Sequence, residues 1–418
     1  MNETTPEGAV ACIETGSSVF LGSACGEPQT LVEALVADHE RLSDVKIITG
    51  LQGSPAAYAD PAYADAFRLR TFMVTATVSD AVQAGQVEYL PCSLSRIGGL
   101  FADGTIPLDV AMVQVSPPDS HGFCSLGTTV AYTLSAVRHA RIVVAEMNQR
   151  MPRTHGEGFI HVAEINFAVR SEREVLEIEP ADPTPELEAI GKSVASLIPD
   201  RATVQVGVGG IADSTWRALA GHSGLGVHSG SLADSVVDLI EAGIVTNENK
   251  RTWRGRSVAG QLIGTRRLYD YADDNPAFAL MSTDVTHDPA SIGLLASFHS
   301  VNSALQVDLR GQVNSETIAG RQVAGTGGAL DFAVGARLSA GGRSIIAMPS
   351  KSRKGHSRIV RETDRGAVTV PASLVDFVVT EHGIAELSGK SIDARARAMA
   401  AIADPQVRED LEASRPEQ

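Results

Sequence analysis

The sequence contains few cysteines, and none of them has the spacing of a metal site or a disulfide framework. Cys12, Cys25, Cys92 and Cys124 are widely separated, and no CxxC pair is present. Structural zinc sites and small disulfide-stabilised domains depend on closely spaced cysteines. We therefore predict a protein with reduced thiols, no bound metal and a cytoplasmic location.

Basic charge and long apolar runs are also scarce. The chain has 35 basic and 50 acidic side chains, so its net charge is −15. Such a surface repels nucleic acids and anionic membranes. No apolar stretch reaches the roughly 18 residues of a membrane-spanning helix, and the first ten residues lack the pattern of a secretion signal. We expect neither a nucleic acid nor a membrane as a partner.

Three common catalytic motifs are absent. The sequence has no G-x-S-x-G elbow, no H-E-x-x-H pair and no G-x-x-x-x-G-K-[ST] loop. These motifs mark the common α/β serine hydrolases, the zinc proteases and the P-loop nucleotidases, respectively. All three enzyme classes are therefore disfavoured.

Glycine is abundant, with 39 residues, and short apolar runs bounded by glycine or proline alternate with helical patterns. This alternation is typical of an α/β fold with largely parallel sheets. We predict strands at 19–22, 45–48, 110–115, 142–145, 204–206, 344–348 and 377–379, and helices at 30–37, 186–197 and 213–220.

The chain is too long for one compact core, which favours two domains. Segment 179–185 contains three prolines and lies near the midpoint of the sequence. Proline disrupts the interior of a helix or a central strand. We therefore predict an N-terminal domain over 1–182 and a C-terminal domain over 183–418.

A glycine-rich loop, residues 207–211, follows the predicted strand at 204–206 and precedes a predicted helix. It consists of Gly207, Val208, Gly209, Gly210 and Ile211. Glycines at such a position let backbone N–H groups approach an anion or an oxyanion. A dinucleotide, another nucleotide-bearing ligand and a plain tight turn all remain possible from the pattern alone.

A second glycine loop contains Gly325, Gly327 and Gly328, and no strand is predicted directly before it. Two such loops far apart in sequence suggest two backbone walls around one ligand, or else two unrelated turns. A basic segment, 351–358, includes Lys351 and Lys354 and is a candidate phosphate-binding region or a solvated loop.

His121 lies in the segment Ser-Pro-Pro-Asp-Ser-His-Gly, 116–122. A histidine in such a loop is either a general base or a residue that hydrogen-bonds within its own loop.

The sequence resembles the acetyl-CoA hydrolase/transferase family of class I CoA-transferases, and in particular the 4-hydroxybutyrate CoA-transferases. The resemblance spans nearly the whole chain. It is carried by segments 22–28, 58–61, 109–122, 151–154, 159–162, 302–308, 320–332 and 380–391.

This resemblance implies two α/β domains with the active site at their interface, and a homodimer or a higher homo-oligomer. It implies a coenzyme A thioester as substrate and no tightly bound cofactor. The loop Gly207–Ile211 would contact CoA, and the loop with Gly325, Gly327 and Gly328 would line the thioester site. Asn302, Lys351 and Lys354 would lie near the CoA arm.

In the family, a glutamate in the pattern His-Ser-Glu attacks the acyl-CoA and becomes a glutamyl-CoA thioester. The corresponding residues here are His228, Ser229 and Gly230. Glycine has no nucleophile, so the usual transferase cycle requires another carboxylate. The missing side chain is also expected to leave room for an acceptor beside the thioester.

Three functions follow from this substitution. The first is direct transfer of the acyl group to a small-molecule acceptor or to water, with His228, His121 or Glu27 as the base. Ser229 is a candidate covalent nucleophile for the same reaction. The second is a CoA-transferase that uses a relocated carboxylate such as Glu27 or Glu316. The third is an acyl-CoA-binding protein without catalysis.

Overall fold

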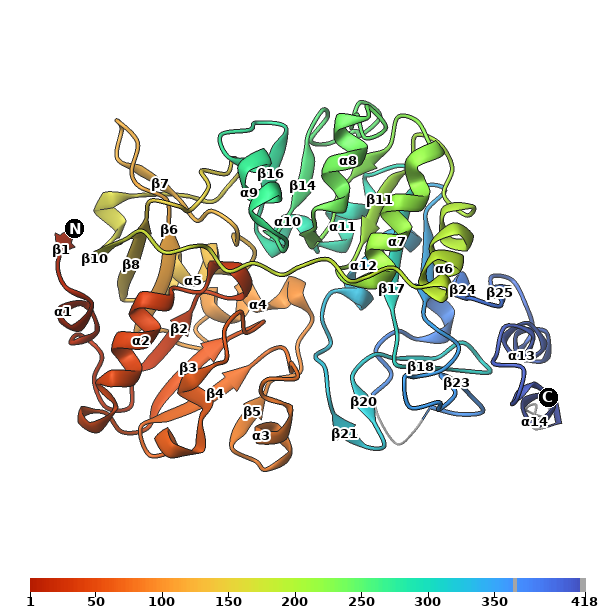
Figure 1. The fold of residues 1–418 in the computed structure, drawn as a ribbon, viewed down its shortest axis with the longest axis horizontal. Helices are drawn as coiled ribbons and strands as arrows, with labels where there is room; N and C mark the ends of the chain where they lie inside the picture. The colour runs from red at the N-terminus through yellow and green to blue at the C-terminus, as the bar shows by residue number, and fades with distance from the viewer. Residues whose placement is uncertain (364–366, 414–418) are drawn as a thin grey trace. The chain divides into compact units, whose positions relative to one another are not determined.

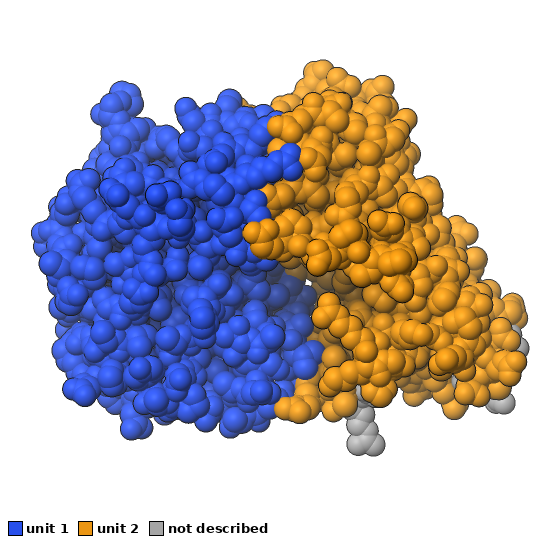
Figure 2. All heavy atoms as spheres, in the orientation of Figure 1, with its two compact units in different colours: residues 1–178, 258–286, 322–327 blue, residues 179–257, 287–321, 328–418 orange. Residues whose placement is uncertain are grey.

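The computed structural model describes residues 1–363 and 367–413, which form two compact units (Figure 2). Unit 1 contains residues 1–178, 258–286 and 322–327, and unit 2 contains the rest. A single junction between 182 and 183 therefore does not describe the two units. Segment 258–286 packs with unit 1 because its backbone bonds there, as in the 2.8 Å bond from Leu262 N–H to Thr128 O.

Unit 1 is built on an eight-stranded sheet in which every neighbouring pair is parallel. Its order is β1 (Asn2–Glu3), β10 (Phe167–Ser171), β8 (Ile142–Asn148), β6 (Val110–Val115), β2 (Ser18–Leu21), β3 (Val45–Thr49), β4 (Phe67–Thr71) and β5 (Val87–Tyr89). After β2, the chain adds β3, β4 and β5 in turn on one side of β2, and β6 then pairs with the other side of β2. The carboxyl ends of β2 and β6 therefore form a topological switch point.

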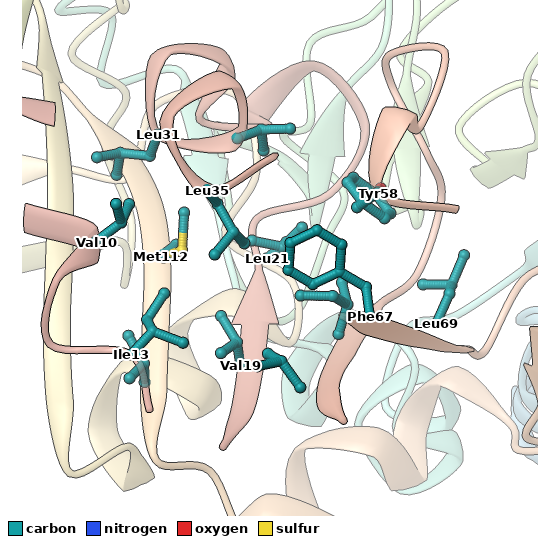
Figure 3. Close-up of a cluster of buried hydrophobic side chains, with 14 of the residues drawn as sticks. Val10, Ile13, Val19, Leu21, Leu31, Leu35, Tyr58, Phe67, Leu69 and Met112 are labelled. Carbon is teal, nitrogen blue, oxygen red and sulfur yellow. The ribbon is translucent and has the colours of Figure 1, made fainter. Parts of the chain in front are cut away.

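A large apolar cluster fills one side of this sheet (Figure 3). It joins side chains of the sheet to α1 (Pro6–Val10) and α2 (Gln29–Ala37). Burial of apolar side chains from both the strands and the helices is the main contribution to the stability of such a layer. The labelled members in Figure 3 are Val10, Ile13, Val19, Leu21, Leu31, Leu35, Tyr58, Phe67, Leu69 and Met112.

Unit 2 contains a six-stranded sheet (Figure 1). Its order is β12 (Gly226–Val227), β11 (Thr203–Val206), β17 (Phe298–Ser303), β22 (Arg343–Ala347), β24 (Phe377–Thr380) and β25 (Gly383–Glu386). All pairs are parallel except β24 with β25. Helix α12 (Ala329–Leu338) packs on β17 and β22, and α6 (Pro185–Ala195) packs on α7 (Gly210–Ala218).

The predicted α/β class and the seven predicted strands are confirmed, with ends that differ by at most three residues. The three predicted helices correspond to α2, α6 and α7. The prediction missed β17, which is central in unit 2, because its sequence Phe-His-Ser-Val-Asn-Ser is not a continuous apolar run. Within the described residues, no helix is long and apolar enough to cross a membrane.

Candidate active site

Four predicted segments meet at the carboxyl edge of the sheet in unit 2. The loop 207–211 follows β11, and the segment 228–230 follows β12. Asn302 lies at the end of β17, and Lys351 follows β22. The first five strands have the order 2-1-3-4-5, whose switch point lies between β11 and β17. Open α/β sheets bind ligands at such a point, so this edge is the candidate active site of unit 2.

The three glycines of the loop 207–211 differ in whether the structure of the protein requires glycine at their positions. Gly209 has a φ of +99°, which a side chain rarely adopts. At Gly210, an ideal Cβ would lie 2.8 Å from Leu187 Cδ1 on α6. At Gly207, φ is not positive, and no heavy atom of the described chain lies within 4 Å of an ideal Cβ. The protein itself therefore does not require glycine at 207, which suits close approach by a ligand.

The segment 228–230 is held against β11 by hydrogen bonds. His228 donates its backbone N–H to Val204 O at 3.1 Å, and its side chain is 1% exposed. The Ser229 hydroxyl donates to Val206 O at 2.9 Å and is fully buried. Ser229 therefore bonds a backbone carbonyl, and this geometry does not favour a nucleophilic role for its hydroxyl.

The space beside Gly230 contains the imidazole of His287. An ideal Cβ at Gly230 would lie 2.8 Å from His287 Nε2 and 2.9 Å from Cε1. Real Cβ atoms do not approach so closely, so a larger residue at 230 would displace this ring. The expectation that the missing side chain leaves open space directly beside Gly230 is therefore wrong.

His287 lies between α10 (Thr283–Thr286) and α11 (Pro289–Gly293). Its ring is 2% exposed and packs against Phe332 of α12, with the ring centroids 4.7 Å apart. Burial lowers the pKa of His287 to about 3, so the ring is neutral at pH 7. The sequence prediction missed His287 because no spacing in the sequence relates it to Gly230.

Polar residues complete this edge of the sheet. The Asn302 amide donates to Gln205 Oε1 at 3.2 Å, which fixes both side chains across β11 and β17. Lys351 is exposed and pairs with Asp404, with Nζ 2.9 Å from Oδ2. Lys354 is also exposed. The charge of Lys351 is thus balanced by Asp404, and Lys354 contributes a second basic side chain at the surface after β22.

The second glycine loop is divided between the units. Gly325 and Gly327 belong to unit 1, and Gly328 belongs to unit 2. An ideal Cβ at Gly325 would lie 2.5 Å from Phe72 O, so this glycine is explained by close backbone packing within unit 1. At Gly328, an ideal Cβ would lie 2.5 Å from His287 Cδ2. Gly328 is therefore the member of this loop that shares a site with Gly230.

Glu27 follows β2 at the switch point of unit 1, but its side chain is fully buried. Its carboxylate accepts hydrogen bonds from the backbone N–H of Gly53 at 3.2 Å and from the hydroxyl of Ser54. Burial raises the pKa of the Glu27 carboxyl, and these hydrogen bonds oppose the rise. These hydrogen bonds indicate that the Glu27 carboxylate stabilises the loop 53–54.

His121 lies in an exposed loop of unit 1. Its backbone N–H donates to Asp119 Oδ1 at 2.8 Å. The same aspartate pairs with Arg153, with Oδ2 2.6 Å from the guanidinium NH2. Asp119 therefore organises this loop and neutralises Arg153. Among the described residues, no group of three or more His, Cys, Asp or Glu side chains is arranged to hold a metal ion.

Comparison with known families matches both parts of the chain. The acetyl-CoA hydrolase/transferase N-terminal domain matches residues 2–180. The acetyl-CoA hydrolase/transferase C-terminal domain matches residues 264–415.

Similar proteins span almost the same length. The 4-hydroxybutyrate coenzyme A transferase of Clostridium kluyveri is 41% identical over 97% of this chain and 95% of its own. The succinyl-CoA:cyclohexane-1-carboxylate CoA transferase of Geobacter metallireducens is 35% identical over 97% and 93%. The crystal structure of RipA from Yersinia pestis superposes with a TM-score of 0.92 at 34% identity, covering 99% of this chain and 96% of that one.

Proposed function

Because the chain belongs to the acetyl-CoA hydrolase/transferase family, we propose that it transfers the acyl group of a CoA thioester directly to a small-molecule acceptor or to water. The protein is an enzyme of the acyl-CoA transferase/hydrolase class, and its substrate is a coenzyme A thioester. Under the proposal, no glutamyl-CoA intermediate forms.

The observation that carries this proposal is the environment of position 230. The family resemblance aligns Gly230 with the nucleophilic glutamate, and glycine supplies no nucleophile. The contacts of Gly230 support the proposal, because the His287 ring lies where a side chain at 230 would begin. A carboxylate at 230 and this ring position are sterically incompatible.

Backbone groups of the site suit the remaining chemistry. The loop 207–211 leads into the first turn of α7, where backbone N–H groups lack helical partners. Such groups stabilise the oxyanion of a tetrahedral intermediate, and one donor contributes about 3–4 kcal/mol to an acyl transfer. Under the proposal, this loop polarises the thioester carbonyl while the acceptor attacks.

The test is an assay of free thiol release from a panel of acyl-CoAs, with amine, hydroxyl and carboxylate acceptors or with buffer alone. We expect thiol release, which direct transfer and hydrolysis both produce. Formation of a new acyl-CoA from added acetate without free thiol would instead identify a CoA-transferase. Binding of acyl-CoA by calorimetry without either product would identify a non-catalytic binding protein.

A CoA-transferase with a relocated carboxylate is the second candidate, because several similar proteins are named as CoA-transferases. Glu27 and Glu316 are the candidate carboxylates. Glu316 is 6% exposed, and its Oε1 accepts a hydrogen bond from Thr369 at 2.9 Å. We predict no covalent intermediate at either residue after incubation with acyl-CoA and borohydride. Mass spectrometry that finds a reduced Glu27 or Glu316 would support this second candidate instead.

A substitution at Gly207 tests the CoA contact of the loop. We expect Gly207→Ala to leave the melting temperature unchanged, because an added Cβ meets no atom of the described chain within 4 Å. We expect it to weaken acyl-CoA binding about tenfold, since one lost backbone contact costs about 1.4 kcal/mol. Calorimetry measures the change, and Gly221→Ala is the control, because its added Cβ also meets no described atom. Equal affinities of the two variants would contradict the assigned contact.

A further inference from the structure

We propose that Lys250 is a positioning residue of the acyl transfer, which fixes the segment 228–230 beside the reacting thioester. The inference rests on the proposed function, because that proposal places the reaction at the segment that follows β12. Lys250, β12 and the segment 228–230 all belong to unit 2, so every contact in the argument lies within one unit.

Lys250 is a buried basic side chain that bonds only backbone carbonyls. It is 3% exposed, and its Nζ donates hydrogen bonds to Val227 O at 2.7 Å and to Arg256 O at 2.8 Å. Within the described part of the chain, no carboxylate pairs with it. Burial lowers the pKa of Lys250 to about 7. A neutral amine has two N–H donors, which match the two carbonyls.

The carbonyl that Lys250 holds belongs to the edge strand of the sheet, β12. The next residue, His228, faces the sheet, because its backbone N–H bonds to Val204 O of β11. At Val227 the backbone bonds side chains instead. Its N–H donates to Asn247 Oδ1 at 2.8 Å, and its carbonyl accepts from Lys250 Nζ. Two side chains therefore take the place of a further strand, and Lys250 bonds the last carbonyl before His228.

The strand makes room for the aliphatic part of this lysine. An ideal Cβ at Gly226 would lie 2.9 Å from Lys250 Cγ and 3.0 Å from Cδ. Gly226 is not among the residues with positive φ, so its backbone conformation does not require glycine. The lysine stem therefore packs directly on the backbone of β12, where a side chain at 226 would displace it.

Stability alone does not explain a lysine at this position. Moving an ionisable amine from water into a protein interior is costly when no acidic group pairs with it. Perturbed ionisable groups of this kind are concentrated at functional sites. What Lys250 supplies is a directional link from Arg256 to Val227, which limits movement of the chain just before the segment 228–230. A site that performs acyl transfer needs such precision, because a misplacement of about 1 Å costs around a hundredfold in rate.

The deciding variant is Lys250→Met, which keeps an unbranched side chain and removes the N–H donors. We expect kcat for thiol release to fall by about 10–100-fold, the range expected for a displaced site. We expect the Kd for acyl-CoA, measured by calorimetry, to change by less than about threefold, because a positioning residue acts on the reaction rather than on ground-state binding. Lys250 is also buried behind β12, away from the loop 207–211 that is assigned to CoA.

The matched control is Asn249→Ala, which changes the neighbouring residue of the same loop. Asn249 Nδ2 donates to Gly224 O at 3.0 Å, so this variant also removes a bond from a side chain to a carbonyl. Gly224 precedes the amino end of β12, away from the segment 228–230. We expect wild-type kcat and Kd in Asn249→Ala, even if its melting temperature falls as far as that of Lys250→Met. A general supporting role of the loop would instead lower kcat in both variants.

Circular dichroism shows whether each variant is folded. If Lys250→Met does not fold, Lys250→Gln decides by the same comparison of kcat and Kd. Its amide keeps a polar group in the buried site, but the side chain ends one bond before the position of Nζ. We therefore expect it to lose kcat as well.

Three results would overturn the assignment: a folded Lys250 variant with wild-type kcat, an equal fall of kcat in Asn249→Ala, or a loss of acyl-CoA affinity as large as the loss of kcat. Failure of the proposed function has a different signature, because the wild-type enzyme would then transfer CoA to acetate without releasing thiol. The same variants would in that case be compared by their rates of acyl-CoA formation. A wild-type protein that catalyses neither reaction would reject both proposals.

Discussion

Substitution Gly230→Glu is expected to abolish thiol release, with a fall in kcat of at least about a hundredfold. The added Cβ would lie 2.8 Å from His287 Nε2, so the buried ring must move. The ring is confined by Phe332 and by Gly328, so its displacement shifts neighbouring parts of the site. A misplacement of about 1 Å at an active site costs around a hundredfold in rate. Thiol release by the purified variant measures the effect.

Two further variants interpret this loss. Gly221→Glu adds the same charge to unit 2 at an exposed position where a Cβ meets no described atom, and it should keep full activity. Because the buried ring must move, we expect Gly230→Glu also to lower the melting temperature. The double variant Gly230→Glu/His287→Ala removes the steric conflict and should regain this loss. We also expect it to transfer CoA to acetate, through the restored carboxylate. Unchanged thiol release in a folded Gly230→Glu variant would contradict the site geometry.

Removal of the Glu27 side chain is expected to lower the free energy of unfolding by about 3 kcal/mol. In Glu27→Ala, the backbone N–H of Gly53 and the hydroxyl of Ser54 lose their acceptor in a region where the carboxylate is fully buried. A buried donor without a partner is costly, and a cavity adds to the loss. Denaturant unfolding of the variant and the wild type measures the difference. A change below about 1 kcal/mol would contradict a structural role.

The variant Glu27→Gln tests the ionisation of this carboxyl. Burial raises its pKa in the folded protein, so the stability contributed by the protonated form is present at low pH and declines as pH rises through the folded pKa. Glutamine does not titrate. The free energy of unfolding of the wild type minus that of Glu27→Gln should therefore be lower at pH 7 than at pH 4. If the free energy of unfolding of the wild type instead increased relative to that of Glu27→Gln between pH 4 and pH 7, the raised pKa of Glu27 would be contradicted.

The predictable part of the fold consists of elements whose sequences are locally distinctive. Strand β6 is buried along its whole length, and its six apolar or amide residues were predicted without error at both ends. Strand β17 escaped prediction because its burial depends on neighbours on both sides, β11 and β22, which no local pattern reveals. The return of segment 258–286 to unit 1 has the same cause, since its backbone partners lie near residue 130.

The sequence by itself determined the α/β class, the family and the glycine loops after the strands, because these depend on local periodicity and on motifs of adjacent residues. The family resemblance also predicts that Gly230 stands at the position of the nucleophilic glutamate, which remains part of the proposed function. Only the tertiary structure decided what occupies the space beside that glycine. His287 meets Gly230 and Gly328 through chain topology, so no spacing in the sequence predicts their contact. The burial of Glu27 against Ser54 was decided in the same way, because a carboxylate's surroundings depend on distant segments that pack around it.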